Sequence, residues 1–188
     1  GVRVDDRLLP ADALVIAGGA WSGDLGEALG VRLPVAPQRG QILHLDLPDE
    51  ETAGGPIVVG FVGHYLLTFP GGRVVAGATR ETGSGFDPRI TAGGVHQALG
   101  QALGLAPGLA AATLAEVRVG LRPASPDGLP ILGRAPGLRN AYLATGHGPS
   151  GLQLGPFSGT LAAGMALGAP PPPNLDLAPF APERFATG

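Results

Sequence analysis

NAYLATGHGPSGLQLG, residues 140–155, is the stretch of sequence that decides the fold. Its apolar run at residues 141–144 predicts a buried strand, the glycines and proline at 146–151 predict a turn, and the residues from Leu152 onward have the composition of a helix. A strand, a glycine turn and a helix in this order present backbone N–H groups to an anion or to an electron-rich ring. The stretch therefore predicts a turn that faces a ligand.

The same turn matches the dinucleotide-binding pattern G-x-G-x-x-G at residues 146–151. That fingerprint requires a second strand after the helix, in a unit of about 30 residues with an acidic residue at its tip. Here the helix runs into Gly168 and the tract Pro170 to Pro173, and Asp176 lies beyond the tract. The turn is therefore expected to touch a cofactor from the far side, as the last element of a fold and not as the first.

Composition narrows the class of protein. Hydrophobic residues make up 44% of the 188 residues and charged residues 14%, which predicts a large buried core. The net charge of -3, without a basic cluster, argues against a nucleic-acid partner. All 12 cationic residues are arginine, so lysine Schiff-base chemistry is excluded and bidentate recognition of carboxylates remains. Cysteine is absent, which excludes disulfides, thiolate nucleophiles and cysteine metal sites.

The start of the sequence is unusual. No signal peptide opens it and no apolar run reaches about 18 residues, so the default expectation is a soluble, cytoplasmic protein without membrane contact. The chain begins at Gly1 without Met, and a strand signal follows almost at once at residues 13–17. This start predicts a piece that begins inside a larger fold.

The first strong strand signal, at residues 13–17, is continuous and apolar, as in a parallel strand that is covered on both faces. Gly18 and Gly19 follow it, and Ser22 is a candidate cap for a short helix over residues 23–29. The two glycines either let backbone approach a ligand at the C-terminal end of the strand or form a tight turn without a ligand. These residues alone favour neither alternative.

The middle of the chain predicts an antiparallel sheet. Polar and apolar residues alternate over residues 41–47, and three short strand signals follow with the spacing of a meander, at residues 57–60, 64–69 and 73–79. A helix is expected over residues 90–103, with Thr91 as its cap.

A second alternating strand, residues 114–123, places four residues on one face: Glu116, Arg118, Gly120 and Arg122. A turn at residues 125–128 and a short strand at 129–132 follow. The final helix, residues 152–167, is rich in small side chains and is therefore expected in the interior. The tail beyond the prolines is expected to form an irregular strap, with Phe180 and Phe185 as anchors.

Two familiar kinds of active site fit poorly. A hydrolase triad of Ser150, His147 and Asp127 is disfavoured, because the segment around Ser150 is not a G-x-S-x-G elbow and Pro149 does not suit that strained turn. The four histidines lie far apart in the sequence without an H-x-x-x-H pair, so no metal site is predicted.

Three polar residues have both a common and a functional interpretation. Arg122 ends a strand before Pro123 and is either a surface ion-pair residue or a bidentate carboxylate ligand. Tyr65 is either a half-buried sheet residue or, with Arg122, a hydroxyl donor in a carboxylate pocket. Arg39 precedes a predicted strand, where it is either a solvated turn residue or a charge directed into a cleft.

Five blocks, taken in order, resemble the D-amino-acid oxidase family of FAD enzymes, and most closely its glycine oxidases of thiamine biosynthesis and related amine or sarcosine oxidases. The blocks are VIAGGAWS (15–22); PQRGQ (37–41); Tyr65 followed by GRVVAGAT (72–79); GLRP (120–123) with DGLPILG (127–133); and TGHG (145–148) with GL (151–152). They extend across most of the chain.

The resemblance implies an oxidoreductase that moves a hydride from the α-carbon of a small amino acid or amine to the flavin of FAD. The imine product then hydrolyses to an oxo acid, and oxygen reoxidises the flavin to give peroxide. Catalysis would depend on orientation and electrostatics, because a substrate with a neutral amine requires no side-chain base.

By position, the resemblance assigns Arg122 to the substrate carboxylate and Tyr65 to the wall of the pocket. The helix N-terminus after the turn would favour negative charge on the reduced ring. The residues that would contact the cofactor are Gly19, Ala20, Trp21, Arg39, Gly146, His147, Gly148, Pro149, Ser150, Gly151, Leu152 and Gln153.

Two departures from the family pattern matter. Pro149 occupies a position where glycine-oxidase-like sequences can carry an arginine, so a second cationic contact is absent and the substrate is expected to differ. The nucleotide-binding strand, the true G-x-G-x-x-G turn and the acidic ribose partner are also missing. The chain alone is therefore expected to bind FAD weakly or not at all.

The predicted fold is mixed α/β, with a largely antiparallel substrate-domain sheet, flanking helices and C-terminal pieces of an FAD-binding domain. Residues 1–33 and 124–168 are assigned to the FAD-binding domain, 34–123 to the substrate-binding domain and 169–188 to a tail. The expected partners are a carboxylate-bearing amino acid or amine, the absent N-terminal half of the polypeptide and a possible second copy in a homo-oligomer. The alternative function is a non-catalytic subunit or carboxylate-binding module of the same family.

Overall fold

The computed structural model describes residues 1–47 and 50–185, and its fold is mixed α/β, as predicted. The chain forms two compact units. The first holds Gly1–Pro37 together with the residues from Arg122 onward, and the second holds Gln38–Leu121. The assignment of these units to FAD binding and substrate binding stays a prediction. Among the described residues, no helix has both the length and the apolar character needed to cross a membrane.

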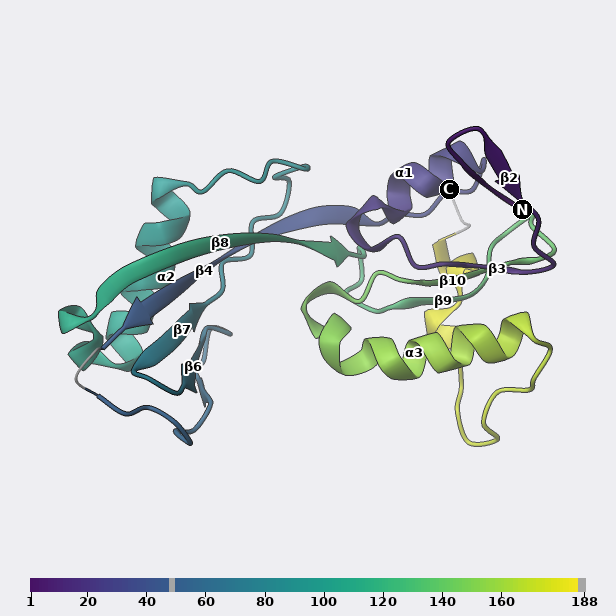
Figure 1. The fold of residues 1–188 in the computed structure, drawn as a ribbon. Coiled ribbons are helices and arrows are strands. Elements are labelled where there is room, and N and C mark those ends of the chain that lie inside the picture. Colours follow the sequence, from purple (N-terminus) through teal and green to yellow (C-terminus); the bar gives the residue numbers. More distant parts are fainter. Residues whose placement is uncertain (48–49, 186–188) are drawn as a thin grey trace. The chain divides into compact units, whose positions relative to one another are not determined.

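The second unit contains a five-stranded sheet in the order β5-β6-β7-β4-β8 (Figure 1). Its strands are β4 (Ala36–Asp46), β5 (Val58–Val59), β6 (Tyr65–Phe69), β7 (Arg73–Gly77) and β8 (Thr113–Ala124). The predicted meander is confirmed, because β6 pairs antiparallel with both β5 and β7. β7 then pairs antiparallel with β4, with Leu43 opposite Ala76.

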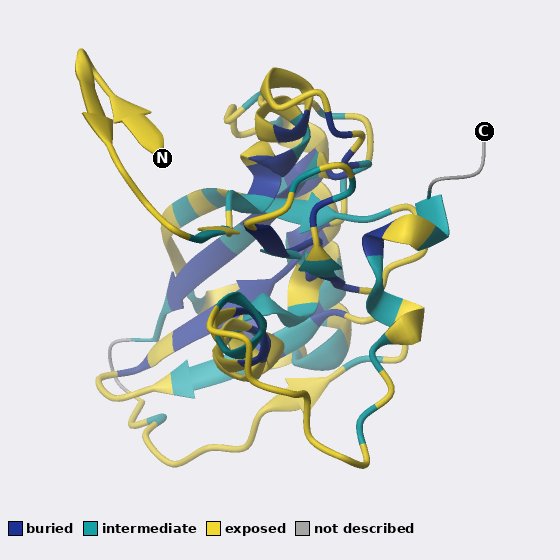
Figure 2. Cartoon of the chain, turned by 90° about the vertical axis from the view of Figure 1, so that its right-hand side faces the viewer, coloured by how far each residue is buried: buried dark blue, intermediate teal, exposed yellow. Residues whose placement is uncertain are grey.

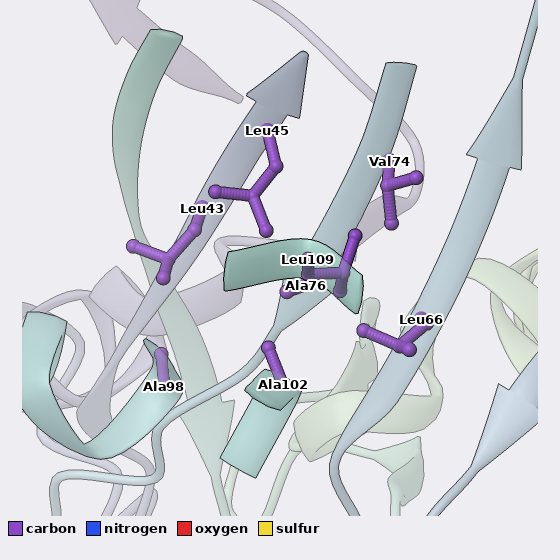
Figure 3. Packing of buried hydrophobic residues seen from close by; sticks show 8 residues of the cluster. All are labelled: Leu43, Leu45, Leu66, Val74, Ala76, Ala98, Ala102 and Leu109. Atoms are coloured by element: carbon purple, nitrogen blue, oxygen red, sulfur yellow. The ribbon is translucent and has the colours of Figure 1, made fainter. Parts of the chain in front are cut away.

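Helix α2 (Ala92–Leu105) covers one face of this sheet, and the short 3-10 helix η2 (Pro107–Ala111) follows it. Thr91 caps α2 as predicted, because its side chain accepts a hydrogen bond from the backbone N–H of Gly94. Figure 3 shows the core, in which aliphatic side chains of β4, β6 and β7 meet the small residues of α2. The buried members are Leu43, Leu45, Leu66, Val74, Ala76, Ala98, Ala102 and Leu109.

The first unit contains a three-stranded sheet in the order β3-β10-β9. Its strands are β3 (Leu14–Ile16), β9 (Ile131–Arg134) and β10 (Ala141–Thr145). β10 runs parallel to β3 and antiparallel to β9. The central strand is therefore the one predicted from the apolar run at residues 141–144. Leu143 and Ile131 are fully buried there, in a cluster that also holds Val31, Leu33 and Val35.

Helices lie on both sides of this sheet (Figure 1). α1 (Ser22–Ala28) follows the 3-10 turn η1 (Gly19–Trp21) on one side, and α3 (Gly151–Ala166) follows η3 (Gly148–Ser150) on the other. α3 packs along all three strands. The tail ends in two further 3-10 turns, η4 (Ala178–Phe180) and η5 (Pro182–Phe185).

Three local predictions in this unit are wrong. Ser22 does not cap α1, because the N-cap is Trp21 and no side chain caps the helix. β3 is not covered on both faces, since Val15 is 43% exposed. α3 is not an interior helix: it buries Ser158, Leu161 and Ala162, while Leu152 and Phe157 are exposed. Its small residues allow close packing on the sheet, but most of its other side chains in the described part of the chain are exposed or half-buried.

An unpredicted hairpin opens the chain. β1 (Val2–Val4) and β2 (Arg7–Leu9) pair antiparallel around Asp5, which has a φ of 52°. Figure 2 shows the hairpin, next to the N label, as exposed along its length. Its two strands contribute nothing to either core cluster.

The tail is held down by a charge pair and an aromatic ring. Arg184 donates two hydrogen bonds to the carboxylate of Asp127, from Nε at 2.7 Å and from Nη2 at 3.2 Å. This pairing lowers the pKa of Asp127 to about 2. Phe185 packs against the core cluster of the unit, as predicted for an anchor.

Candidate functional site

Two glycine turns lie at one edge of the three-stranded sheet. β3 and β10 are parallel neighbours, so their carboxyl ends meet at the same edge, which is where open α/β sheets bind ligands. Gly19 follows β3 with a φ of 55°, and Gly148 follows β10 with a φ of 53°. A Cβ atom built on either glycine would find no heavy atom of the described residues within 4 Å. Both turns therefore present bare backbone to open space, as an approaching flat ring requires.

Gly146 has a different role in the same turn. Its φ is 72°, and a Cβ there would lie 3.1 Å from Cγ1 of Ile131 and 3.4 Å from Cβ of Ser125. This glycine therefore lets the chain leave β10 closely packed against its neighbours, while Gly148 faces outward.

The end of β8 is attached to this turn. Ala124, the last residue of β8, forms an antiparallel bridge with His147. Arg122 precedes the bridge by two residues, about 7 Å of extended strand. The half-buried Arg122 and the Gly146 turn thus belong to the same unit and are joined through one backbone bridge.

His147 is the titratable group of the turn. Its side chain is buried, and its Nε2 has no hydrogen-bond partner among residues 1–47 and 50–185. Burial lowers the pKa of His147 below its ordinary value of 6.5, because the cation loses hydration. The ring is therefore neutral at pH 7, with one nitrogen left without a partner.

We expect this burial to make stability depend on pH. Below about pH 6.5 the unfolded chain binds a proton at His147 that the folded chain does not bind, so the free energy of unfolding falls as the pH decreases. His64, whose pKa burial also lowers, adds to the effect. Between pH 7.5 and pH 5.5, the free energy of unfolding measured with urea should fall less for His147→Gln than for the parent chain. The control is His96→Gln on the exposed face of α2; equal losses in the parent and His147→Gln would contradict the assignment.

The other residues predicted to touch the cofactor differ in exposure. Trp21, Pro149, Leu152 and Gln153 are exposed, and Leu152 is 97% exposed. Gly151 and Ser150 are half-buried, whereas Ala20 is buried and can offer a ligand only its backbone. Their contact with a cofactor stays a prediction.

Arg39 lies in the second unit and is neither a turn residue nor solvated. It belongs to β4, is 8% exposed and pairs with two carboxylates, at 2.7 Å to Glu81 and 3.0 Å to Asp87. It also donates to the backbone oxygens of Asp87 and Arg89. Hydrogen bonds from Arg89 and then from Arg39 hold the pKa of Asp87 well below its usual range. All of these partners are protein groups, and contact of Arg39 with a cofactor stays a prediction.

Tyr65 also lies in the second unit, in β6, where it is half-buried and pairs with Gly77 of β7. A Cβ on Gly77 would come within 2.8 Å of the Tyr65 hydroxyl oxygen, so the glycine makes room for the phenol. This contact explains the position of Tyr65 in the sheet, and its role in a substrate pocket stays a prediction.

The geometry agrees with the rejection of the hydrolase triad. Asp127 accepts hydrogen bonds from Arg184, from the backbone N–H of Leu129 and from Ser125, and His147 Nε2 has no partner in the described part of the chain. Across residues 1–47 and 50–185, no three metal-binding side chains lie close enough to hold an ion.

Sequence reasoning missed Ser22 and Thr145 as partners at the edge of the sheet. Their hydroxyl oxygens are 2.5 Å apart, although the residues are 123 positions apart in the chain. The only sequence signal was that each polar residue stands near a glycine pair or turn that follows an apolar strand.

Comparison with known proteins gives the family. The family model described as FAD dependent oxidoreductase matches residues 1–165. The uncharacterized oxidoreductase YurR of Bacillus subtilis is 43% identical over 97% of this chain and 49% of its own length. A glycine oxidase of Pseudomonas putida is 38% identical over 97% of this chain and 48% of its own.

Solved structures agree with the sequence matches. The crystal structure of iminodiacetate oxidase from Chelativorans sp. BNC1 superposes with a TM-score of 0.88 and 48% identity, covering 95% of this chain and 48% of that one. The chain thus spans about half the length of the curated relatives it matches. The chain belongs to the family of FAD-dependent oxidoreductases.

Proposed function

We propose that this chain supplies the substrate carboxylate ligand and one wall of the flavin site in an FAD-dependent oxidase of small amino acids or amines. The observation that carries the proposal is the bridge between Ala124 and His147, which joins the strand of Arg122 to the glycine turn. The relatives named as glycine oxidase and iminodiacetate oxidase support the same class of substrate, a small amine that bears a carboxylate.

The residues of the edge fit a flavin. A planar ring needs close approach to backbone, and Gly19 and Gly148 both lack any atom that would block it. α3 begins beside Gly148, so its first backbone N–H groups favour negative charge on a bound ring. When bound, FAD supplies the acceptor for the hydride of the substrate α-carbon.

The protein groups bind and orient the substrate. Arg122 holds the carboxylate by a bidentate pair of hydrogen bonds, which fixes the α-carbon relative to the ring. The neutral ring of His147 adds no positive charge beside the reacting amine. No protein base is assigned, since a neutral amine already has the lone pair that the reaction uses.

The test is a peroxide assay of the enzyme that contains this chain, with glycine, sarcosine, iminodiacetate and D-amino acids as substrates. We expect oxygen-dependent peroxide release with at least one of them. Reduction of the flavin without peroxide would indicate a dehydrogenase. If substrates leave the flavin spectrum unchanged while a carboxylate still binds, the chain is part of a non-catalytic binding module instead.

The isolated chain should bind FAD weakly. Among the described elements, no glycine turn and helix lead directly into a second parallel strand, since β10 pairs with β3 only after the whole second unit. A directly connected βαβ unit provides most dinucleotide contacts. Titration of FAD with the chain should leave flavin fluorescence nearly unquenched at micromolar protein. Stoichiometric quenching at that concentration would contradict this expectation.

A further inference from the structure

A pair of buried hydroxyl groups connects the two glycine turns of the sheet edge. Ser22 begins α1, just after the Gly19 turn, and Thr145 ends β10, just before the Gly146 turn. The Ser22 side chain is fully buried and Thr145 is 1% exposed. Their hydroxyl oxygens are 2.5 Å apart, and Thr145 also donates to the backbone oxygen of Gly19 at 3.3 Å.

These bonds have a direction. A hydroxyl carries one proton, and Thr145 gives its proton to the Gly19 oxygen, so Ser22 must be the donor in the bond between the two side chains. The chain of donors therefore runs from Ser22 to Thr145 to the Gly19 carbonyl. Removing the Thr145 hydroxyl leaves the buried Ser22 hydroxyl without its acceptor and takes one of two hydrogen bonds from the Gly19 oxygen.

The Gly19 carbonyl is where this path meets the first glycine turn. Its oxygen accepts two hydrogen bonds, one from the backbone N–H of Ser22 within η1 and one from the Thr145 hydroxyl at the end of β10. The bond from Thr145 is the one that ties the Gly19 turn to the end of β10. Its loss therefore leaves the two glycine turns freer to shift relative to each other.

We propose that Ser22 and Thr145 are positioning residues that keep the Gly19 and Gly148 turns in register against the flavin ring. The proposal rests on the proposed function, since it takes the open side of these turns to be the flavin side. Turns that shift against each other would present the bare backbone of Gly19 and Gly148 less closely to a bound ring. Loss of the pair should therefore weaken FAD binding and shift the reduction potential of the bound flavin.

The experiment uses the holoenzyme with Thr145→Val, which keeps the shape and removes the hydroxyl. We expect about a tenfold rise in the FAD dissociation constant, a shifted reduction potential and a changed visible flavin spectrum. Ser22→Ala should give smaller changes of the same sign, and Thr145→Ser should restore all three values. The matched control is Thr160→Val, which removes a hydroxyl that donates to a backbone oxygen of α3.

The outcomes separate this proposal from the proposed function. If the parent holoenzyme carries no flavin, the proposed function itself fails. If the parent carries flavin and Thr145→Val only lowers thermal stability, with potential and spectrum unchanged, the pair is merely structural and the inference is overturned. If Thr145→Val does not fold, the potentials of Ser22→Ala and Thr145→Ser decide in the same way.

Discussion

Replacing Arg122 by alanine should raise the Michaelis constant for a carboxylate-bearing substrate by about 100-fold or more. A bidentate guanidinium–carboxylate pair consists of two charge-assisted hydrogen bonds, and alanine replaces neither. Arg122 lies two residues before the bridge to His147, and the following Pro123 restricts its backbone, so a neighbouring arginine cannot take its place. Steady-state kinetics of the purified variant measure the rise. Arg122→Lys should raise the Michaelis constant less, because lysine keeps the positive charge but cannot form the bidentate pair.

The matched control is Arg118→Ala, in the same strand and on the same face by the two-residue period of a strand. Arg118 pairs with Glu116 at 2.8 Å and both side chains are largely exposed, so its loss should leave the Michaelis constant near the parent value. A second control is an amine substrate without a carboxylate, for which Arg122→Ala should have little effect. Equal losses for both substrates would mean that Arg122 does not bind the carboxylate.

Local sequence patterns predicted most of the secondary structure. The apolar run of β10, the strands β4 and β8 and the cap at Thr91 were each predicted from neighbouring residues, and the structure contains all of them. The alternation in β4 predicted a strand with one wet face, which is wrong, because Gln41 and His44 are buried. The hairpin of β1 and β2 was missed because its strands have three residues each. Strands that short show too little alternation to stand out.

Predictions that depended on distant partners were less successful. The partners of Arg39 lie 42 and 48 residues away, so nothing near it in the sequence indicated a buried ion pair. The same holds for Ser22, whose hydroxyl bonds to Thr145 instead of capping its own helix. Small side chains in α3 correctly indicated close packing on the sheet, but they could not tell how many faces of the helix would be covered in this chain.

The candidate site was predictable only in part. Two local sequence patterns, glycines after apolar strands and an arginine before a proline, were enough to identify the elements that carry the site. Their meeting at one sheet edge follows from the parallel pairing of β3 with β10 and from the bridge at His147, both of which are tertiary facts. The family resemblance predicted the identity of the ligand, which neither local pattern could supply.

Substituting Gly148 by alanine should weaken FAD binding by the holoenzyme at least tenfold. The methyl group itself meets none of the described residues, because none of their heavy atoms lies within 4 Å of the built Cβ. We therefore attribute a loss of flavin affinity beyond the backbone strain to the space in front of the turn, where we expect the ring. Gly19→Ala should act in the same way, because its turn is equally open. Equilibrium titration of the apoenzyme with FAD measures both effects.

The control for strain is Gly137→Ala. Gly137 has a φ of 74° and is equally open, but it lies in the turn before β10, at the opposite end of that strand from Gly148. Alanine at a positive φ costs about 1 kcal/mol in either place, so both variants should lose similar stability. Only Gly148→Ala should lose flavin affinity. If the two variants bind FAD equally well, Gly148 does not face the ring. The glycines at residues 146–151 would then serve only the backbone conformation of the turn.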